Sequence, residues 1–212
     1  AQYTPLPPSR GESPASSEAN PPLRGAGGCL LTKWDIFHYV YALLHHPQYR
    51  AKYAANLKRE LPRIPFVQSP FEGGRGDVFW AFVEAGKKLA DLHVNYEQQP
   101  KYPLKFIETG EKLDWRVTKM KLSKDRTQIV YNHLWTLAGI PPEAFDYKLG
   151  NKSALHWILD QYQVTTDTRS GIVNDPNRAD EPEYIVNLLQ RVITVSVETV
   201  QIVNALPALG EQ

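Results

Sequence analysis

Basic side chains gather near the middle of the chain, where they suit one kind of chemistry, the neutralisation of phosphate groups. Across residues 101–126, eight Lys or Arg side chains stand against four Asp or Glu. Each phosphate that a cation neutralises releases a counterion, which adds to the affinity for nucleic acid. A charge run is also typical of a solvated surface, and the pattern alone leaves both interpretations open. The basic residues concerned are Arg116, Lys119, Lys121, Lys124 and Arg126.

One histidine–aspartate pair has the spacing of an acid–base site. His156 and Asp160 are four residues apart, so on a helix the carboxylate could orient the imidazole. Catalysis requires further groups that converge on a substrate, and a pair of this kind is usually structural. The adjacent His45 and His46 would point about 100° apart on a helix and could not share a metal. We therefore expect no catalytic motif, no cofactor and no metal site.

The composition is that of a water-soluble globular protein. Of the 212 residues, 42% are hydrophobic and 22% are charged, and the formal net charge is +1. This length supports one hydrophobic core or two small ones. Cys29 is the single cysteine, which excludes an intrachain disulfide and fits the reducing cytoplasm. No apolar run approaches the roughly 20 residues of a membrane helix, so we expect no membrane partner.

The N-terminal segment differs in composition from the rest of the chain. Residues 1–28 are dominated by Pro, Ser, Ala and Gly, which cannot bury enough apolar surface to offset the entropy of ordering. We expect a flexible linker or lead-in there and one domain over residues 29–212. The chain starts at Ala1 without an initiator Met, which suggests a fragment of a longer protein.

Hydrophobic periodicity predicts the helices and strands that carry these residues. Apolar residues at helical spacing predict helices before residue 100 and after residue 150, and the final apolar segment favours a helix by its length. Between them the period shifts toward two, which indicates strands. The fold class is therefore α+β, with N-terminal helices, a small central antiparallel sheet or hairpin, and C-terminal helices. Helices are expected at residues 32–46, 48–61, 77–99, 153–162 and 183–206, and paired strands at 113–123 and 127–140, joined by a turn at 123–125.

Four long blocks of the sequence resemble one known family in the same order. The first block is DIFHYVYALLHHPQYRAKYAANLKRELPRIPF at 35–66, and the others lie at 79–97, 150–177 and 188–203. They resemble the C-terminal specificity region of Type ISP restriction–modification enzymes and of related helicase–adenine-methyltransferase polypeptides. The resemblance covers nearly everything from about Trp34 to Leu206.

The resemblance implies a division of labour within a longer polypeptide. In the family, a nuclease, a translocating ATPase, an adenine methyltransferase and a target-recognition domain share one chain, and only the last resembles this sequence. It implies a DNA-binding domain of prokaryotic defence that positions double-stranded DNA for the methyltransferase and helicase/nuclease domains of the parent polypeptide. One alternative is a docking module between the methyltransferase and helicase domains without base readout. A second alternative is a small hydrolase that uses His156 and Asp160.

The polar tract after residue 163 offers two roles of its own. As a reader, Arg169 could donate two hydrogen bonds to guanine, and Asn174 could pair with adenine. As scaffold, Asp167 and Asn174 would form Asx turns, and Gly171 would supply a positive φ where the chain reverses. We favour scaffold with phosphate contacts. The predicted DNA-binding residues are Arg116, Lys119, Lys121, Lys124 and Arg126 in the hairpin, with Lys152 and Arg169 at its edge.

Overall fold

The computed structural model describes residues 23–24, 30–66, 77–110 and 114–209. The predicted linker at residues 1–28 and its boundary with the predicted domain therefore fall outside the described residues, except for β1 (Leu23–Arg24). This short strand pairs antiparallel with β2 (Leu30–Leu31).

The N-terminal half of the described chain is helical, as predicted. The helix α1 (Lys33–His45) begins at a capping box, in which the Thr32 hydroxyl accepts from the Asp35 amide and the Asp35 carboxylate accepts from the Thr32 amide. The long helix α3 (Asp77–Val94) crosses α1. Two 3₁₀ turns, η1 (Asn56–Lys58) and η2 (Tyr96–Gln98), follow the helices.

The prediction of one helix over residues 48–61 was wrong. The helix α2 (Pro47–Lys52) ends after six residues, and the exposed Ala54, Ala55 and Asn56 lead into the 3₁₀ turn η1. Instead the chain folds back over the helices. The hydroxyl of the fully buried Tyr49 donates a hydrogen bond to the Arg63 carbonyl at 2.6 Å. This bond holds the segment around Arg63 against the helices.

The central sheet is antiparallel with the strand order β3-β6-β5-β4. Two strand predictions were wrong in extent. The stretch 113–123 contributes only two paired residues, and the stretch 127–140 is two strands instead of one. The stretch 127–140 divides at a turn after Val130, where the Asn132 side-chain oxygen accepts hydrogen bonds from the amides of Leu134 and Trp135. The strands are β3 (Lys105–Glu108), β4 (Lys121–Leu122), β5 (Gln128–Val130) and β6 (Trp135–Ala138).

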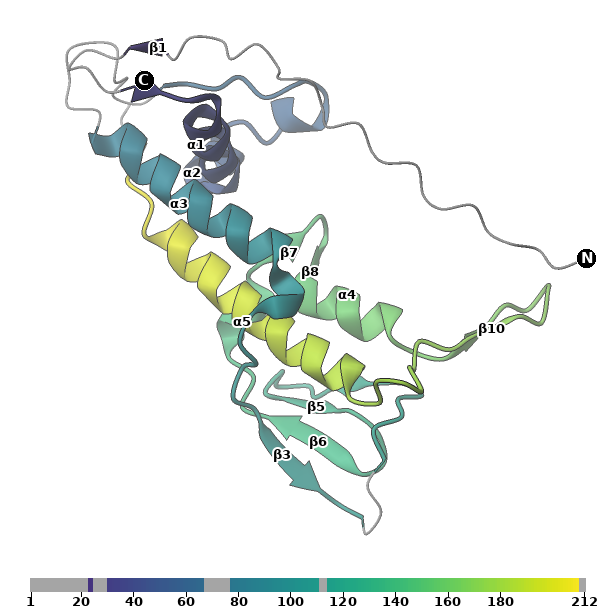
Figure 1. Ribbon diagram of the computed structural model, residues 1–212. Coiled ribbons are helices and arrows are strands. Elements are labelled where there is room, and N and C mark those ends of the chain that lie inside the picture. Colours follow the sequence, from purple (N-terminus) through teal and green to yellow (C-terminus); the bar gives the residue numbers. More distant parts are fainter. Residues whose placement is uncertain (1–22, 25–29, 67–76, 111–113, 210–212) are drawn as a thin grey trace, which may run out of the picture.

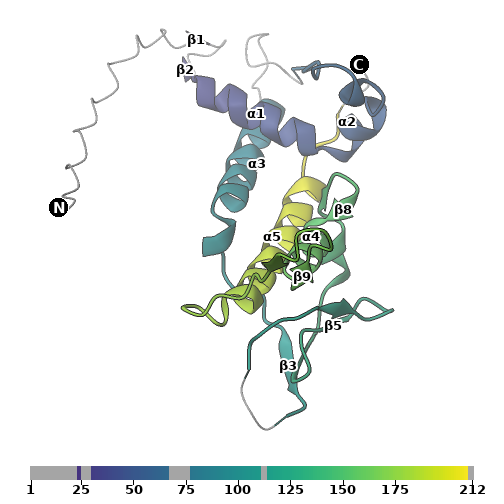
Figure 2. The ribbon, with the colours of Figure 1, turned by 90° about the vertical axis from the view of Figure 1, so that its right-hand side faces the viewer.

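The C-terminal part confirms the two predicted helices. The helix α4 (Ala154–Gln161) is capped by Ser153, and α5 (Tyr184–Asn204) is a long helix despite its strand-like alternation. Two small hairpins flank α4, and Figure 1 shows the second one projecting from the body. In Figure 2 the side of the molecule that carries this hairpin faces the viewer. The remaining short elements are η3 (Pro142–Phe145), β7 (Lys148–Leu149), β8 (Lys152–Ser153), β9 (Thr165–Thr166) and β10 (Val173–Asn174).

The α-helices and the small antiparallel sheet confirm the α+β class. The described residues form two hydrophobic cores. One core joins α1, α2 and the first half of α3 around Tyr39, Phe79 and Phe82. The other joins the sheet, α4 and α5 around Ile129 and Leu188. The helices α3 and α5 lie side by side and connect the two cores (Figure 1). None of the described helices has the length and apolar character needed to cross a membrane.

Candidate nucleic-acid interface

Three of the five predicted hairpin cations line one shallow hollow at the edge of the sheet. Arg116 and Lys119 come from the irregular segment before β4, and Lys121 comes from β4 itself. The hollow has a volume of about 500 Å³, and all three basic residues are exposed. We name this site the cationic hollow, and its lining residues are Asp114, Arg116, Thr118, Lys119, Lys121, Val130, Asn132 and His133.

The backbone of the segment 114–119 is held by side chains instead of a neighbouring strand. The Asn177 amide donates to the Val117 carbonyl and accepts from the Val117 amide, both at 2.8 Å. The Asn132 amide donates to the carbonyls of Asp114 and Arg116 at 2.8 and 3.1 Å. Because these bonds replace a strand ladder, the segment is fixed without being part of the sheet.

One of the three basic residues of the cationic hollow, Arg116, is paired with a carboxylate. The Arg116 guanidinium forms an ion pair with Asp175 at 2.6 Å, although 55% of its side chain remains exposed. The pKa of Asp175 is lowered by hydrogen bonds from Asn177 and by Arg116. Within the described part of the chain, Lys119 and Lys121 form no ion pair, so their charges are available to a ligand.

The other two hairpin cations lie outside the cationic hollow. Lys124 and Arg126 belong to the β4–β5 turn, where the Asp125 carboxylate accepts from Ser123 and Thr127 and its pKa is lowered as a result. The predicted turn is therefore confirmed. Arg126 adopts a φ of 59°, and its guanidinium lies 5.7 Å from the centre of the Phe145 ring. The structure thus brings three of the five cations together.

Lys152 and Arg169 lie on the two small hairpins. Lys152 forms an ion pair with Asp160, and its ammonium lies 5.4 Å from the centre of the Trp157 ring. Arg169 is exposed in the loop of the β9–β10 hairpin, which projects from the molecule (Figure 1). Neither residue lines the cationic hollow.

The loop of this hairpin is built as the scaffold interpretation predicted. The Asp167 carboxylate accepts from the amides of Arg169 and Ser170 at 3.0 and 2.7 Å, and Gly171 has a φ of +70°. The predicted Asx turn at Asn174 is wrong, because Asn174 lies in β10 opposite Thr165. The Asx turn forms one residue later, where Asp175 accepts from the Asn177 amide.

The histidine–aspartate pair of the hydrolase alternative is not assembled. The Asp160 carboxylate binds Lys152, and His156 Nδ1 lies 2.7 Å from the Ser153 hydroxyl. Ser153 is only 3% exposed and caps α4, so a substrate cannot reach it. Across the described ranges, no cluster of three His, Cys, Asp or Glu side chains could hold a metal ion.

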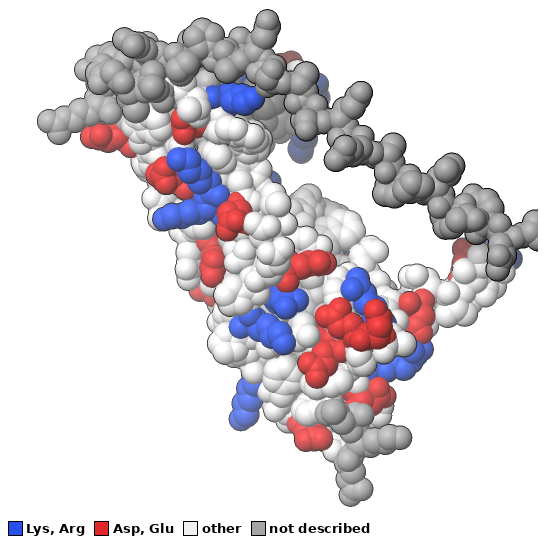
Figure 3. Space-filling view, in the orientation of Figure 1, with Lys and Arg blue, Asp and Glu red and all other residues white. Residues whose placement is uncertain are grey.

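The cationic hollow contains three polar residues without a formal charge that the sequence did not single out, namely Thr118, Asn132 and His133. Thr118 and His133 are exposed there, whereas the side-chain nitrogen and oxygen of Asn132 both form hydrogen bonds with backbone groups. Their role was not visible because all three lie in stretches that were predicted to be strands, 113–123 and 127–140. Elsewhere the surface charge is mixed, and Figure 3 shows basic and acidic side chains interspersed on one face.

Comparisons with known proteins point to one family. The family model of the Type ISP C-terminal specificity domain matches residues 17–188. One similar solved structure is a nuclease-deletion mutant of the Type ISP restriction-modification enzyme LlaGI in complex with a DNA substrate mimic. It is 42% identical in sequence and has a TM-score of 0.74. The match covers 86% of this chain and 17% of the LlaGI chain. The ATP-dependent Type ISP enzyme LlaBIII bound to DNA is 39% identical with a TM-score of 0.75, over 86% and 12%.

A third solved structure agrees with these two. The DrdV–DNA complex is 39% identical with a TM-score of 0.68, over 84% of this chain and 18% of its own. This chain therefore spans less than a fifth of the length of these relatives. No curated protein matches it in sequence.

Proposed function

The chain belongs to the Type ISP C-terminal specificity domain family, and from that premise we propose that it recognises a target sequence in double-stranded DNA. The solved relatives LlaGI, LlaBIII and DrdV are each in complex with DNA or a DNA mimic. The docking alternative has less support, because it requires no DNA contact from this part of the chain.

The observation that carries the proposal is the composition of the cationic hollow. Lys119 and Lys121 present ammonium groups that form no ion pair with the described residues and that suit phosphates, whereas Thr118 and His133 add exposed polar groups that suit base edges. Arg116 could contact either a phosphate or a base edge, and its ion pair with Asp175 fixes the position of its guanidinium. A duplex against the hollow would place Lys124 and Arg126 beside the adjoining backbone, with Lys152 and Arg169 as edge contacts.

The proposed partners follow from the same family. We infer that the chain works beside an adenine methyltransferase and a helicase/nuclease of its parent polypeptide, in the cytoplasm of a prokaryote that uses the system in defence. The chemistry would then belong to those domains, and the role of this chain would be to select and position the duplex.

The salt dependence of DNA binding tests the role of the hollow. Replacement of Lys119 and Lys121 by Ala should flatten the slope of log affinity against log salt by about two, since each phosphate contact contributes about 0.9. The measurement is the fluorescence anisotropy of a labelled duplex at several salt concentrations. The control is Lys88→Ala, an exposed cation on α3 that does not line the cationic hollow. An unchanged slope in the double variant would remove the hollow from the DNA interface.

A further inference from the structure

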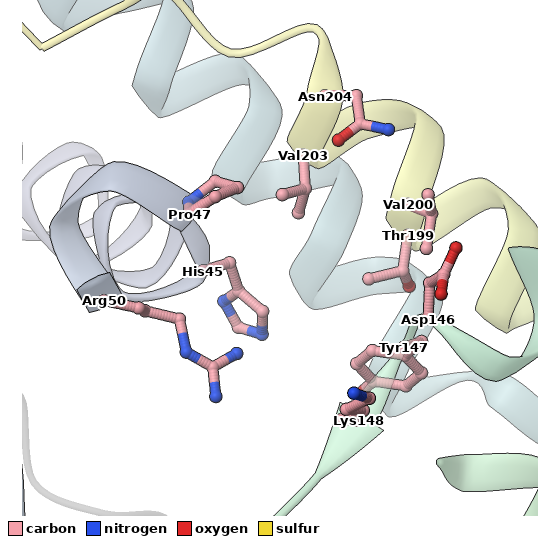
Figure 4. A pocket seen from close by; sticks show the side chains of 10 residues that line it. All are labelled: His45, Pro47, Arg50, Asp146, Tyr147, Lys148, Thr199, Val200, Val203 and Asn204. Atoms are coloured by element: carbon pink, nitrogen blue, oxygen red, sulfur yellow. The ribbon is translucent and has the colours of Figure 1, made fainter. Parts of the chain in front are cut away.

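A second hollow lies at the junction of the two cores, away from the sheet. One wall is the end of α1 and the start of α2, the other is the link from η3 to β7, and the floor is the last part of α5 (Figure 4). Its volume is about 410 Å³. We name it the junction hollow, and its lining residues are His45, Pro47, Arg50, Asp146, Tyr147, Lys148, Thr199, Val200, Val203 and Asn204.

Two basic side chains extend into the junction hollow from opposite walls. Arg50 comes from α2 and Lys148 from β7, and both line the hollow. Figure 4 shows the Arg50 guanidinium pointing into the open space and the Lys148 side chain beside Tyr147 on the facing wall. Both residues are exposed, and neither forms an ion pair with any described residue. One carboxylate, that of Asp146, also lines the hollow, but in Figure 4 it lies on the α5 side, away from Arg50. Two positive charges that line one hollow repel each other, and an anion bound between them would offset this repulsion.

His45 adds a hydrogen-bonding group between the two cations. Its Nδ1 donates to the Tyr41 carbonyl at 2.8 Å, because a carbonyl oxygen can only accept. The neutral ring therefore has no proton on Nε2, and a proton gained there would turn that atom into a donor. Burial and the nearby charge of Arg50 lower the pKa of His45. A bound anion would offset the charge of Arg50 and favour the protonated ring.

We propose that the junction hollow binds a phosphate group between the guanidinium of Arg50 and the ammonium of Lys148. A guanidinium can bind two phosphate oxygens at once, and the ammonium supplies a compact charge on the other side. The phosphate belongs either to a nucleic-acid backbone or to a free nucleotide or phosphate ion. The first source rests on the proposed function, whereas the second is independent of it.

Phosphate binding should depend on pH in a defined direction. The groups that face His45 are Arg50 on α2, Tyr41 on α1 and His93 on α3, with Tyr147 stacked on His93. Burial lowers the pKa of His93 to about 4 and raises the pKa of Tyr147 to about 12, so both are neutral near pH 7. His45 is therefore the facing group whose protonation a bound phosphate should favour, and the contribution of His45 to binding should strengthen as the pH falls below 7.

Nuclear magnetic resonance of the full chain tests the site directly. Inorganic phosphate should shift the His45 ring resonances and raise the pKa of His45, whereas chloride at the same ionic strength should not. The shift should be lost in the Arg50→Ala, Lys148→Ala double variant, retained in Lys88→Ala and largely retained in Arg50→Lys. Phosphate-independent His45 resonances in a folded wild-type chain would overturn the proposal.

DNA binding then separates the two sources of phosphate. If the backbone supplies it, the double variant should lose about one in the log–log salt slope, because both cations hold the same phosphate. If a free nucleotide or phosphate ion supplies it, the salt slope of the double variant should equal that of the wild type, although inorganic phosphate still shifts the His45 resonances of the wild type. The proposed function fails separately: a chain that shows the His45 shift but binds no duplex would retain the phosphate site and lose the DNA role.

Discussion

At the level of single residues, asparagine side chains fix the backbone that carries Arg116 and Lys119. Asn177 lies sixty positions after Val117, yet its amide supplies both hydrogen bonds of that residue's backbone. Val117 is fully buried, so without these bonds its polar groups would have no access to water. The position of Arg116 and Lys119 thus depends on a residue with no charge.

We predict that Asn177→Ala weakens both folding and DNA binding. Loss of the amide leaves the Val117 backbone unsatisfied, which should reduce the free energy of unfolding by about 1–3 kcal/mol. The DNA affinity should fall as well, because the segment 114–119 would no longer be fixed. Urea unfolding and duplex anisotropy measure the two effects.

Asn174→Ala is the matched control, since Asn174 is exposed on β10 and three residues away. It should leave the unfolding free energy nearly unchanged. Equal stability of the two variants would show that the Asn177 bonds contribute little.

At the scale of elements, the crossing of α1 and α3 depends on one glycine. A Cβ atom at Gly86 would lie 1.9 Å from the carbonyl oxygen of His38. The contact is with backbone, so no side-chain rotation can relieve it. The two helices can approach this closely only because position 86 has no side chain, and the first core depends on that approach.

We predict that Gly86→Ala destabilises the protein although alanine is the better helix former. The propensity gain is about 1 kcal/mol, whereas separating the helices should cost about 1–3 kcal/mol beyond that gain. Thermal unfolding followed by circular dichroism measures the difference. A higher melting temperature in the variant would show that the helices adjust without loss of packing.

At the scale of the whole molecule, His93 connects the two cores. Its Nδ1 lies 2.7 Å from the Tyr41 hydroxyl of α1, and its Nε2 lies 2.9 Å from the Thr199 hydroxyl of α5. The ring also stacks on Tyr147 with a centroid distance of 5.0 Å. Burial, and then the proximity of His45, lower the pKa of His93 from 6.5 to about 4.

We predict that stability falls with pH in the window that these pKa values define. The unfolded chain binds a proton at position 93 below about pH 6.5, whereas the folded chain resists it until about pH 4. The contribution of His93 is therefore complete above pH 6.5 and is lost as the pH falls toward 4. His45 and His46, whose pKa values are also lowered, act in the same direction.

Melting temperatures across this pH range test the prediction. The wild type should lose stability more steeply between pH 6.5 and 4 than His93→Gln, which keeps a polar side chain but has no titration. Parallel pH profiles in the two proteins would contradict a role for His93.

The helices were predictable because their signal is local. In α1, α3, α4 and α5, apolar residues three and four positions apart share one face, and this spacing is visible without tertiary contacts. The strands were less predictable. Around Trp115 and Val117 burial alternates as in a strand, but the backbone partners are side chains, and alternation does not reveal that.

Local patterns along the chain were enough to predict the fold class, the long helices, the turn at 123–125 and the concentration of positive charge, since each depends on residues that are close in sequence. Which basic residues lie together depends instead on contacts between distant parts of the chain. The tertiary structure placed Arg116, Lys119 and Lys121 around one hollow with Thr118 and His133, directed Arg126 to Phe145, and set Arg50 across from Lys148. The physical reason is that charge is a property of a residue, whereas a site requires distances between residues that only packing fixes.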